Sequence, residues 1–246
     1  MSAEFPAGHP TGLAQDDPNP TGRAGGPQGG RKWEVLDVLA LNVATGIVES
    51  VCLAHLGGLF AAYVTGTVIL AGVHAATGQM AALLPYAVAF AGFLIGGFVG
   101  GALVRDGRRP KASYVRALAV EGGSLAAAAG ILLVPGIPEE AGHSGSLALL
   151  AFGMAVQFSA TRHLNVENLR FAAATGLVHS LAHEATAGRG TPLHLTRRLL
   201  ALATLSGGAA VGALIGRWSV VAAIALATLI VLGSAAVAAV ALQRRR

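Results

Sequence analysis

Long apolar segments separated by short polar loops dominate this chain from about residue 35 onward. A membrane-spanning helix needs about 20 mostly apolar residues, and most of these segments reach that length. The sequence therefore predicts an all-α, polytopic membrane helix bundle and argues against a soluble enzyme. The eight segments lie at approximately 35–54, 57–77, 82–104, 113–134, 146–161, 166–187, 199–216 and 219–242.

The distribution of charge agrees with a membrane environment. Of the 246 residues, 54% are hydrophobic and only 12% are charged, whereas a soluble domain carries about 25% charged residues. The 17 Lys and Arg exceed the 12 Asp and Glu, but they stand in short runs between apolar segments. That pattern is typical of loops on the inner side of a membrane. We therefore expect the lipid bilayer, and no nucleic acid, as a partner.

The amino-terminal residues 1–33 are polar and rich in Pro and Gly, which predicts a disordered tail ahead of a transmembrane domain at 34–246. The tail has no apolar run typical of a cleavable secretory signal. We expect the first apolar segment to insert after Arg31 and Lys32, which would leave the tail in the cytoplasm. This predicts a multi-pass protein of the plasma membrane with both termini inside.

Basic residues also indicate how many segments cross. The sixth segment, 166–187, is interrupted by five ionisable residues, so its longest free stretch is too short to span. If all eight segments crossed, the basic residues would divide almost evenly between the two sides. If segments 57–77 and 166–187 enter and leave on one side, every basic residue except Arg217 falls inside. The sequence thus predicts about six spans plus two re-entrant or short segments, although 57–77 is apolar enough to cross.

An internal repeat is predicted between residues 35–134 and 146–242. The motif FAAYVTGTV beginning at Phe60 resembles FAAATGLV beginning at Phe171, and a later glycine-rich stretch also matches at a similar offset. With three spans in each half, the second half would be inverted relative to the first. Inverted repeats are common in secondary transporters, where interrupted segments of the two halves form the substrate site.

The Thr-Gly pairs within these motifs are the candidate helix breaks. They are Thr65-Gly66 and Thr175-Gly176. A glycine allows a break or a close approach, and a threonine hydroxyl can bind freed backbone groups or a ligand. Close helix packing by small residues is the alternative. For the glycine stripes spaced four apart we expect such packing against a neighbouring helix, either in the same chain or in a homo-oligomer. These stripes are Gly92, Gly96, Gly100 and Gly208, Gly212, Gly216.

Ionisable residues inside apolar segments require an explanation, because each costs about 2.5–3.5 kcal/mol at the bilayer centre. Glu49 and Glu121 lie deep in their segments and are candidates for proton or cation coupling. The alternative for both is a structurally paired carboxyl. Asp37 lies near a helix start, where we expect it to reach the interface. Gln157 is a candidate substrate-lining residue or an interhelical hydrogen-bonding group.

Enzymatic and metal chemistry find little support. His179 and His183 share a helix face, but their order differs from HExxH and no third ligand is evident. The single cysteine, Cys52, allows no intramolecular disulfide and no cysteine metal cluster. We therefore expect no catalytic residue, no metal and no cofactor.

Two stretches, GIVESVCLAHLGGLFAAYVTGT and GMAVQFSATRHLNVENLRFAAATG, resemble the YoaK family of bacterial multi-pass membrane proteins, a domain of unknown function (DUF1275). The resemblance covers roughly residues 35–240 and implies six spans. Three positions depart from the family pattern. Glu49-Ser50 stands in place of Asp-Ala, Thr67 in place of Asn, and Phe158 in place of the Asn after glutamine.

These observations favour a transporter of a small solute or ion, with a central site lined by Glu49, Gln157 and the two Thr-Gly pairs. Glu49 and Glu121 would then couple transport to an ion. The alternative is a non-transporting scaffold or accessory protein in which the same residues only pack helices.

Overall fold

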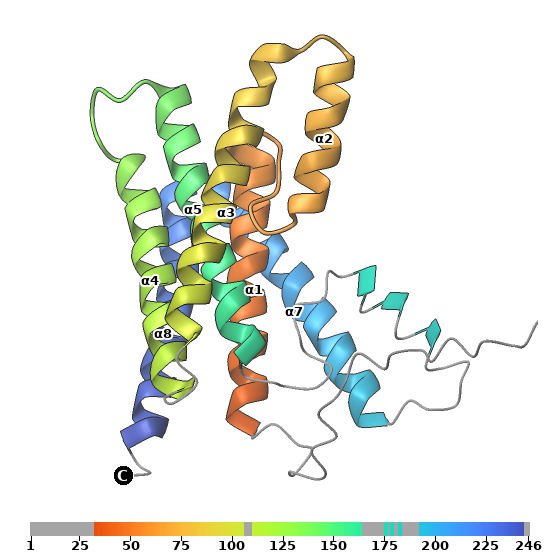
Figure 1. Cartoon of the computed structure of the whole chain (residues 1–246), viewed down its shortest axis with the longest axis vertical. Helices are drawn as coiled ribbons and strands as arrows, with labels where there is room; N and C mark the ends of the chain where they lie inside the picture. Colours follow the sequence, from red (N-terminus) through yellow and green to blue (C-terminus); the bar gives the residue numbers. More distant parts are fainter. Residues whose placement is uncertain are drawn as a thin grey trace, which may run out of the picture.

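The computed structural model describes residues 32–105, 110–163, 175–176, 178–179, 182–183 and 192–243. Within these residues the chain is helical, with no strand, and the predicted membrane helix bundle is confirmed (Figure 1). The predicted tail and most of segment 166–187 lie outside the described residues. The elements are α1 (Lys32–His55), α2 (Val64–Ala76), the short 3-10 helix η1 (Met80–Ala82), α3 (Leu83–Val104), α4 (Pro110–Ile131), α5 (Glu139–His163), α7 (Pro192–Gly216) and α8 (Val220–Gln243).

Six of these helices have the length of a membrane span. Five are also apolar enough to cross, namely those containing Glu34–His55, Met80–Val104, Glu139–Arg162, Leu195–Gly216 and Val220–Ala241. The sixth, α4, has 22 residues, which corresponds to about 33 Å of helix. It is less apolar because it carries Lys111, Arg116 and Glu121, and it lies beside α5 and α8 over the same depth (Figure 1).

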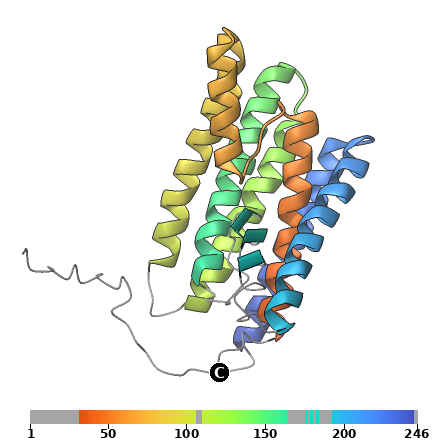
Figure 2. The same cartoon turned by 90° about the vertical axis from the view of Figure 1, so that its right-hand side faces the viewer.

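Helix directions alternate through the bundle. Helices α1, α4 and α7 run one way, and α3, α5 and α8 run the other way (Figure 1). The main contacts join α3 to α5 and α1 to α7, while α4 contacts both α5 and α8, and α8 also contacts α1. Exchanging α1, α3 and α4 for α5, α7 and α8 reproduces this set of contacts. Figure 2 accordingly shows α3 and α7 at opposite edges, with α1 and α5 between them.

Both glycine stripes lie at helix crossings within the chain. A Cβ on Gly92 or Gly96 would lie only 2.4 or 2.2 Å from a backbone oxygen of α5, and one on Gly208 would lie 2.3 Å from the backbone oxygen of Val43 in α1. Only glycine permits such an approach of two backbones. The stripes therefore join α3 to α5 and α7 to α1, as close packing predicts.

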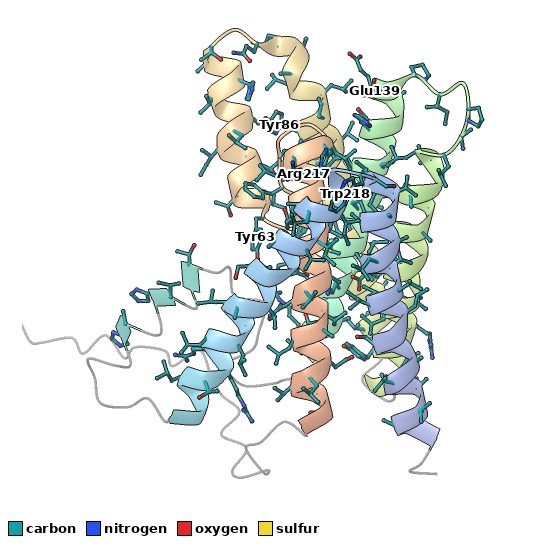
Figure 3. All side chains as sticks on the ribbon, turned by 180° about the vertical axis from the view of Figure 1, so that it is seen from behind. Tyr63, Tyr86, Glu139, Arg217 and Trp218 are labelled. Atoms are coloured by element: carbon teal, nitrogen blue, oxygen red, sulfur yellow. The ribbon has the colours of Figure 1, made fainter. Side chains whose placement is uncertain are left out.

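The second apolar segment does not cross. After α1 ends, residues 56–63 run back into the bundle, and α2 then returns to the end of the bundle where α1 stops (Figure 1). Helix α2 has 13 residues, about 20 Å, which is too short to span. In Figure 3, Tyr63 at its start lies deeper than Tyr86 and Glu139. This arrangement agrees with the re-entrant prediction for 57–77.

Basic residues of the described part gather at one end of the bundle. Arg217 lies at the opposite end, in the turn before Trp218, which is 81% exposed (Figure 3). The others lie in the first or last two turns of helices, or directly after a helix, at the end of the bundle where α1 starts: Lys32, Arg105, Lys111, Arg116, Arg162, Arg197 and Arg198. The unequal distribution expected for a membrane protein is thus present in three dimensions.

Candidate functional site

A line of polar residues runs along the buried face of α1. Asp37, Thr45 and Glu49 are 5%, 0% and 5% exposed, and their spacings are multiples of four residues. Residues four apart lie on the same face of a helix, and twelve residues of helix rise about 18 Å. Each of the three has a partner on a different element, so the line connects α1 to much of the bundle interior.

Glu49 holds the re-entrant loop. Its two carboxyl oxygens accept hydrogen bonds from the backbone N–H groups of Ala61, at 3.2 Å, and Ala62, at 2.5 Å. These N–H groups immediately precede α2, whose N-cap residue Tyr63 makes no side-chain capping bond. A carboxylate is stabilised at a helix N-terminus by unpaired N–H groups and by the helix dipole. Glu49 therefore serves α2 in place of a local cap.

Thr67 fixes the same loop from the other side. Its hydroxyl donates to the carbonyl of Phe60 at 2.7 Å and accepts from the N–H of Phe60 at 3.1 Å. Gly66 packs against the Phe60 ring, since a Cβ there would lie 2.9 Å from a ring carbon. Glu49 and Thr67 thus both bind the same loop.

The two Thr-Gly pairs do not form a common polar site in the described residues. Thr65 is exposed on the outer side of α2, away from the buried line of α1. Thr175 is exposed and Gly176 is half-buried, and both have helical backbone. Most of the segment around them lies outside the described residues. His179 and His183 are exposed too, with their rings stacked 6.0 Å apart.

Gln157 joins α1 to α5 at mid-depth. It is fully buried; its Nε2 donates to the Leu41 carbonyl at 3.4 Å, and its Oε1 accepts from the Thr45 hydroxyl at 3.1 Å. Thr45 lies at the middle of the 22-residue span of α1. Of the two roles expected for Gln157, the hydrogen bond between helices is the one observed in this conformation.

Glu121 is buried in a different environment. It is 0% exposed, and neither carboxyl oxygen has a hydrogen-bond partner among the described residues. Its Cγ lies beside Gly153 of α5, one helical turn from Gln157, because a Cβ on Gly153 would be 3.6 Å from it. Glu121 is therefore close to the depth of the Thr45–Gln157 pair.

Asp37 corrects an expectation from the sequence. We expected it to reach the interface, but it is buried, accepts a hydrogen bond of 2.5 Å from the Tyr114 hydroxyl, and is hydrogen-bonded by the Ser234 side chain. The signal available in the sequence was a tyrosine in α4 and a serine in α8. Hydropathy alone does not indicate that these three residues meet.

Among the described residues, no group of three or more His, Cys, Asp or Glu side chains could hold a metal ion. The buried polar residues instead form three separate sets. Glu49 binds the loop before α2, Thr45 pairs with Gln157, and Asp37 pairs with Tyr114, which lies seven residues before Glu121 on α4. These sets can bind a proton or a small polar solute, since they place carboxyl, amide and hydroxyl groups inside the bilayer.

Comparison with known proteins assigns the family. No curated protein and no solved structure matches the chain. The family model described as "Protein of unknown function (DUF1275)" matches residues 38–238, which include Thr45, Glu49, Glu121 and Gln157. The chain therefore belongs to the DUF1275 family of proteins of unknown function.

Proposed function

We propose that this membrane protein is a secondary transporter of a small solute or ion, built from two inverted halves around a polar site at mid-depth. The observation that carries the proposal is the exchangeable arrangement of the six spans. Helices α1, α3 and α4 relate to one another as α5, α7 and α8 do, with every direction reversed. Together with the repeated FAA and Thr-Gly motifs, this supports an inverted duplication.

The re-entrant element adds to this support. In transporters of this class, half-helices that end inside the membrane point their N-termini at the site, since the backbone N–H groups there attract anionic groups. Helix α2 begins inside the bundle, and the N–H groups before it already bind the carboxylate of Glu49. Glu49 would thus position α2 during transport.

We place the solute site at Thr45 and Gln157, between the first helices of the two halves. Their polar atoms bind each other and the Leu41 carbonyl, so this conformation is closed. A movement of one half against the other would separate the α1–α5 contact and free an amide and a hydroxyl for a solute. The proposal assigns no catalytic residue and requires no cofactor.

Charge supports an orientation as well. The end of the bundle that carries Arg105, Arg162 and Arg198 would face the cytoplasm, because short inner loops are enriched in Lys and Arg. Both termini would then lie on the cytoplasmic side of the plasma membrane, and Arg217 would lie on the outer side.

Accessibility of the mid-depth site tests the transporter proposal. In a Cys52→Ala background, Thr45→Cys is compared with Ala44→Cys, since both positions are 0% exposed. A transport cycle opens the polar site to water, so we expect a small membrane-impermeant thiol reagent to modify the cysteine at position 45 faster than that at 44. Equal protection of both positions in vesicles, with no solute from a panel stabilising the protein, would favour the non-transporting scaffold.

A further inference from the structure

Two buried carboxyl groups of the bundle interior lie in opposite environments. Asp37 accepts hydrogen bonds from the hydroxyl groups of Tyr114 and Ser234, and such donors favour the ionised form. Glu121, seven residues after Tyr114 on α4, receives no hydrogen bond from the described residues. When two interior carboxyl groups have such different surroundings, their proton affinities differ, and the group without hydrogen-bond donors holds the proton more tightly.

The helices that pack on α4 offer Glu121 no counter-charge near its depth. Helix α8 has no ionisable residue between Val220 and Gln243, and in α3 only Tyr86, near the opposite end, is ionisable. The charged residues of α5 stand near its ends, and Arg116 of α4 is exposed. Asp37, the charged residue that acts on Glu121 through space, is an acid and supplies no positive charge. The charged residues of α5 are Glu139, Glu140 and Arg162, and its histidines are His143 and His163.

We propose that Glu121 is a proton-binding site and that the proton is the ion coupled to transport by this chain. The coupling of this proton to transport rests on the proposed function, whereas the binding of the proton rests on the geometry alone. A carboxylate without donors or counter-charge in a low-dielectric interior is strongly disfavoured, so the group binds a proton instead. Glu121 and Asp37 are two acids that act on each other through space, which opposes ionisation of both groups together.

A metal cation fits this site less well than a proton. A cation such as Na⁺ or Ca²⁺ needs several oxygen ligands at once. The hydroxyl of Ser124, next to Glu121 on α4, donates to the Glu121 backbone carbonyl at 2.8 Å, and no cluster of three ligand side chains occurs in the described part of the chain.

Difference infrared spectroscopy of the purified full chain at neutral pH tests the site. We expect a carbonyl band of a protonated carboxyl that is present in the wild type, is lost in Glu121→Gln, and is retained in Glu139→Gln, whose carboxyl is exposed. The band should also persist in Asp37→Asn, which keeps an acceptor for Tyr114. In deuterated water the wild-type band should shift, because a coupling proton must exchange with solvent. A band that survives Glu121→Gln, disappears in Asp37→Asn, or never exchanges would overturn the proposal.

A second measurement needs no substitution. Dicyclohexylcarbodiimide, an apolar reagent, takes the proton of a protonated carboxyl on its nitrogen while the carboxylate oxygen adds to its central carbon. The O-acylisourea then rearranges to a stable N-acylurea. We expect peptide mass spectrometry of the treated wild-type protein to locate this adduct on Glu121. A protein modified elsewhere but not at Glu121 would contradict the inference even if the Glu121→Gln variant failed to fold.

The proton site and the transporter can fail separately. In vesicles that contain a pH-sensitive dye, solute-driven proton movement is expected in the wild type and not in Glu121→Gln. If the infrared band behaves as expected but no solute moves protons, the transporter proposal fails and the proton site stands. If solute moves equally well in Glu121→Gln, transport stands and proton coupling through Glu121 is wrong.

Discussion

Two adjacent glycines of α3 allow a direct test of how α3 and α5 are held together. A Cβ on Gly96 would lie 2.2 Å from the backbone oxygen of Phe152 in α5, about 1.2 Å short of the 3.4 Å at which ordinary contact begins. Because that oxygen belongs to a helix backbone, it cannot rotate away, and α3 and α5 must separate. A Cβ on Gly97 would meet nothing within 4 Å. Gly97→Ala is therefore a matched control one residue away.

The expected energies have opposite signs. Overpacking at Gly96→Ala costs about 1–3 kcal/mol, and the separation also weakens dispersion contacts along the crossing. Gly97→Ala should gain about 0.5–1 kcal/mol, because alanine is the better helix former. The two variants thus differ by roughly 1.5–4 kcal/mol, or roughly 3–16 °C in Tm for a chain of this size.

Cys52 supplies the assay, because it is the single cysteine of the chain and is 0% exposed. A dye that fluoresces on reaction with thiols reports unfolding in detergent as the temperature rises. We expect Gly96→Ala to melt well below the wild type and Gly97→Ala at or slightly above it. If both variants melted at the same temperature, the α3–α5 crossing would not depend on Gly96 and the inferred contact would be wrong.

Three further predictions follow from other contacts. At the α1–α7 crossing, Gly208→Ala should lower the Tm and Gly207→Ala should not, since a Cβ would lie 2.3 Å from a backbone oxygen in the first case and in open space in the second; equal effects would refute this crossing. In Glu49→Gln one of the two loop N–H groups faces the side-chain NH₂ group, which cannot accept a hydrogen bond, so stability should fall by about 1–3 kcal/mol. An unchanged melting curve would show that Glu49 does not bind the loop. A single cysteine at the exposed Gln79, in a Cys52→Ala background, should react with an impermeant reagent added outside intact cells; reaction only after lysis would reverse the proposed orientation.

Much of the architecture was predictable from local sequence. Membrane spans are recognised by length and hydropathy, and each apolar segment outside 166–187 overlaps one α-helix, although α5 and α7 begin seven residues before the segments expected at 146–161 and 199–216. The distribution of basic residues predicted that 57–77 would turn back, and residues 56–63 enter the bundle before the 13-residue α2 leaves it again. Glycines four apart indicated close helix crossings, because only small residues let backbones approach in lipid.

The candidate site was less predictable, because its partners come from segments far apart in the chain. The sequence identified Glu49, Glu121 and Gln157 as unusual, since a polar residue in an apolar helix is locally visible. It did not indicate that Glu49 would meet Ala61 and Ala62, that Asp37 would be buried against Tyr114, or that Thr65 would face outward.

The physical reason lies in the solvent. Lipid tails are as apolar as the side chains that face them, so hydropathy determines which segments cross the bilayer but gives little preference for the face each helix turns inward. That rotation is decided by interlocking contacts, such as Gly96 against Phe152 and Gly208 against Val43. By itself the sequence indicated the apolar spans, favoured a re-entrant segment at 57–77, and indicated the end of the bundle that carries the basic residues. Only the tertiary structure decided that Glu49 binds a loop, that Gln157 joins α1 to α5, and that Glu121 is left with no hydrogen-bond partner among the described residues.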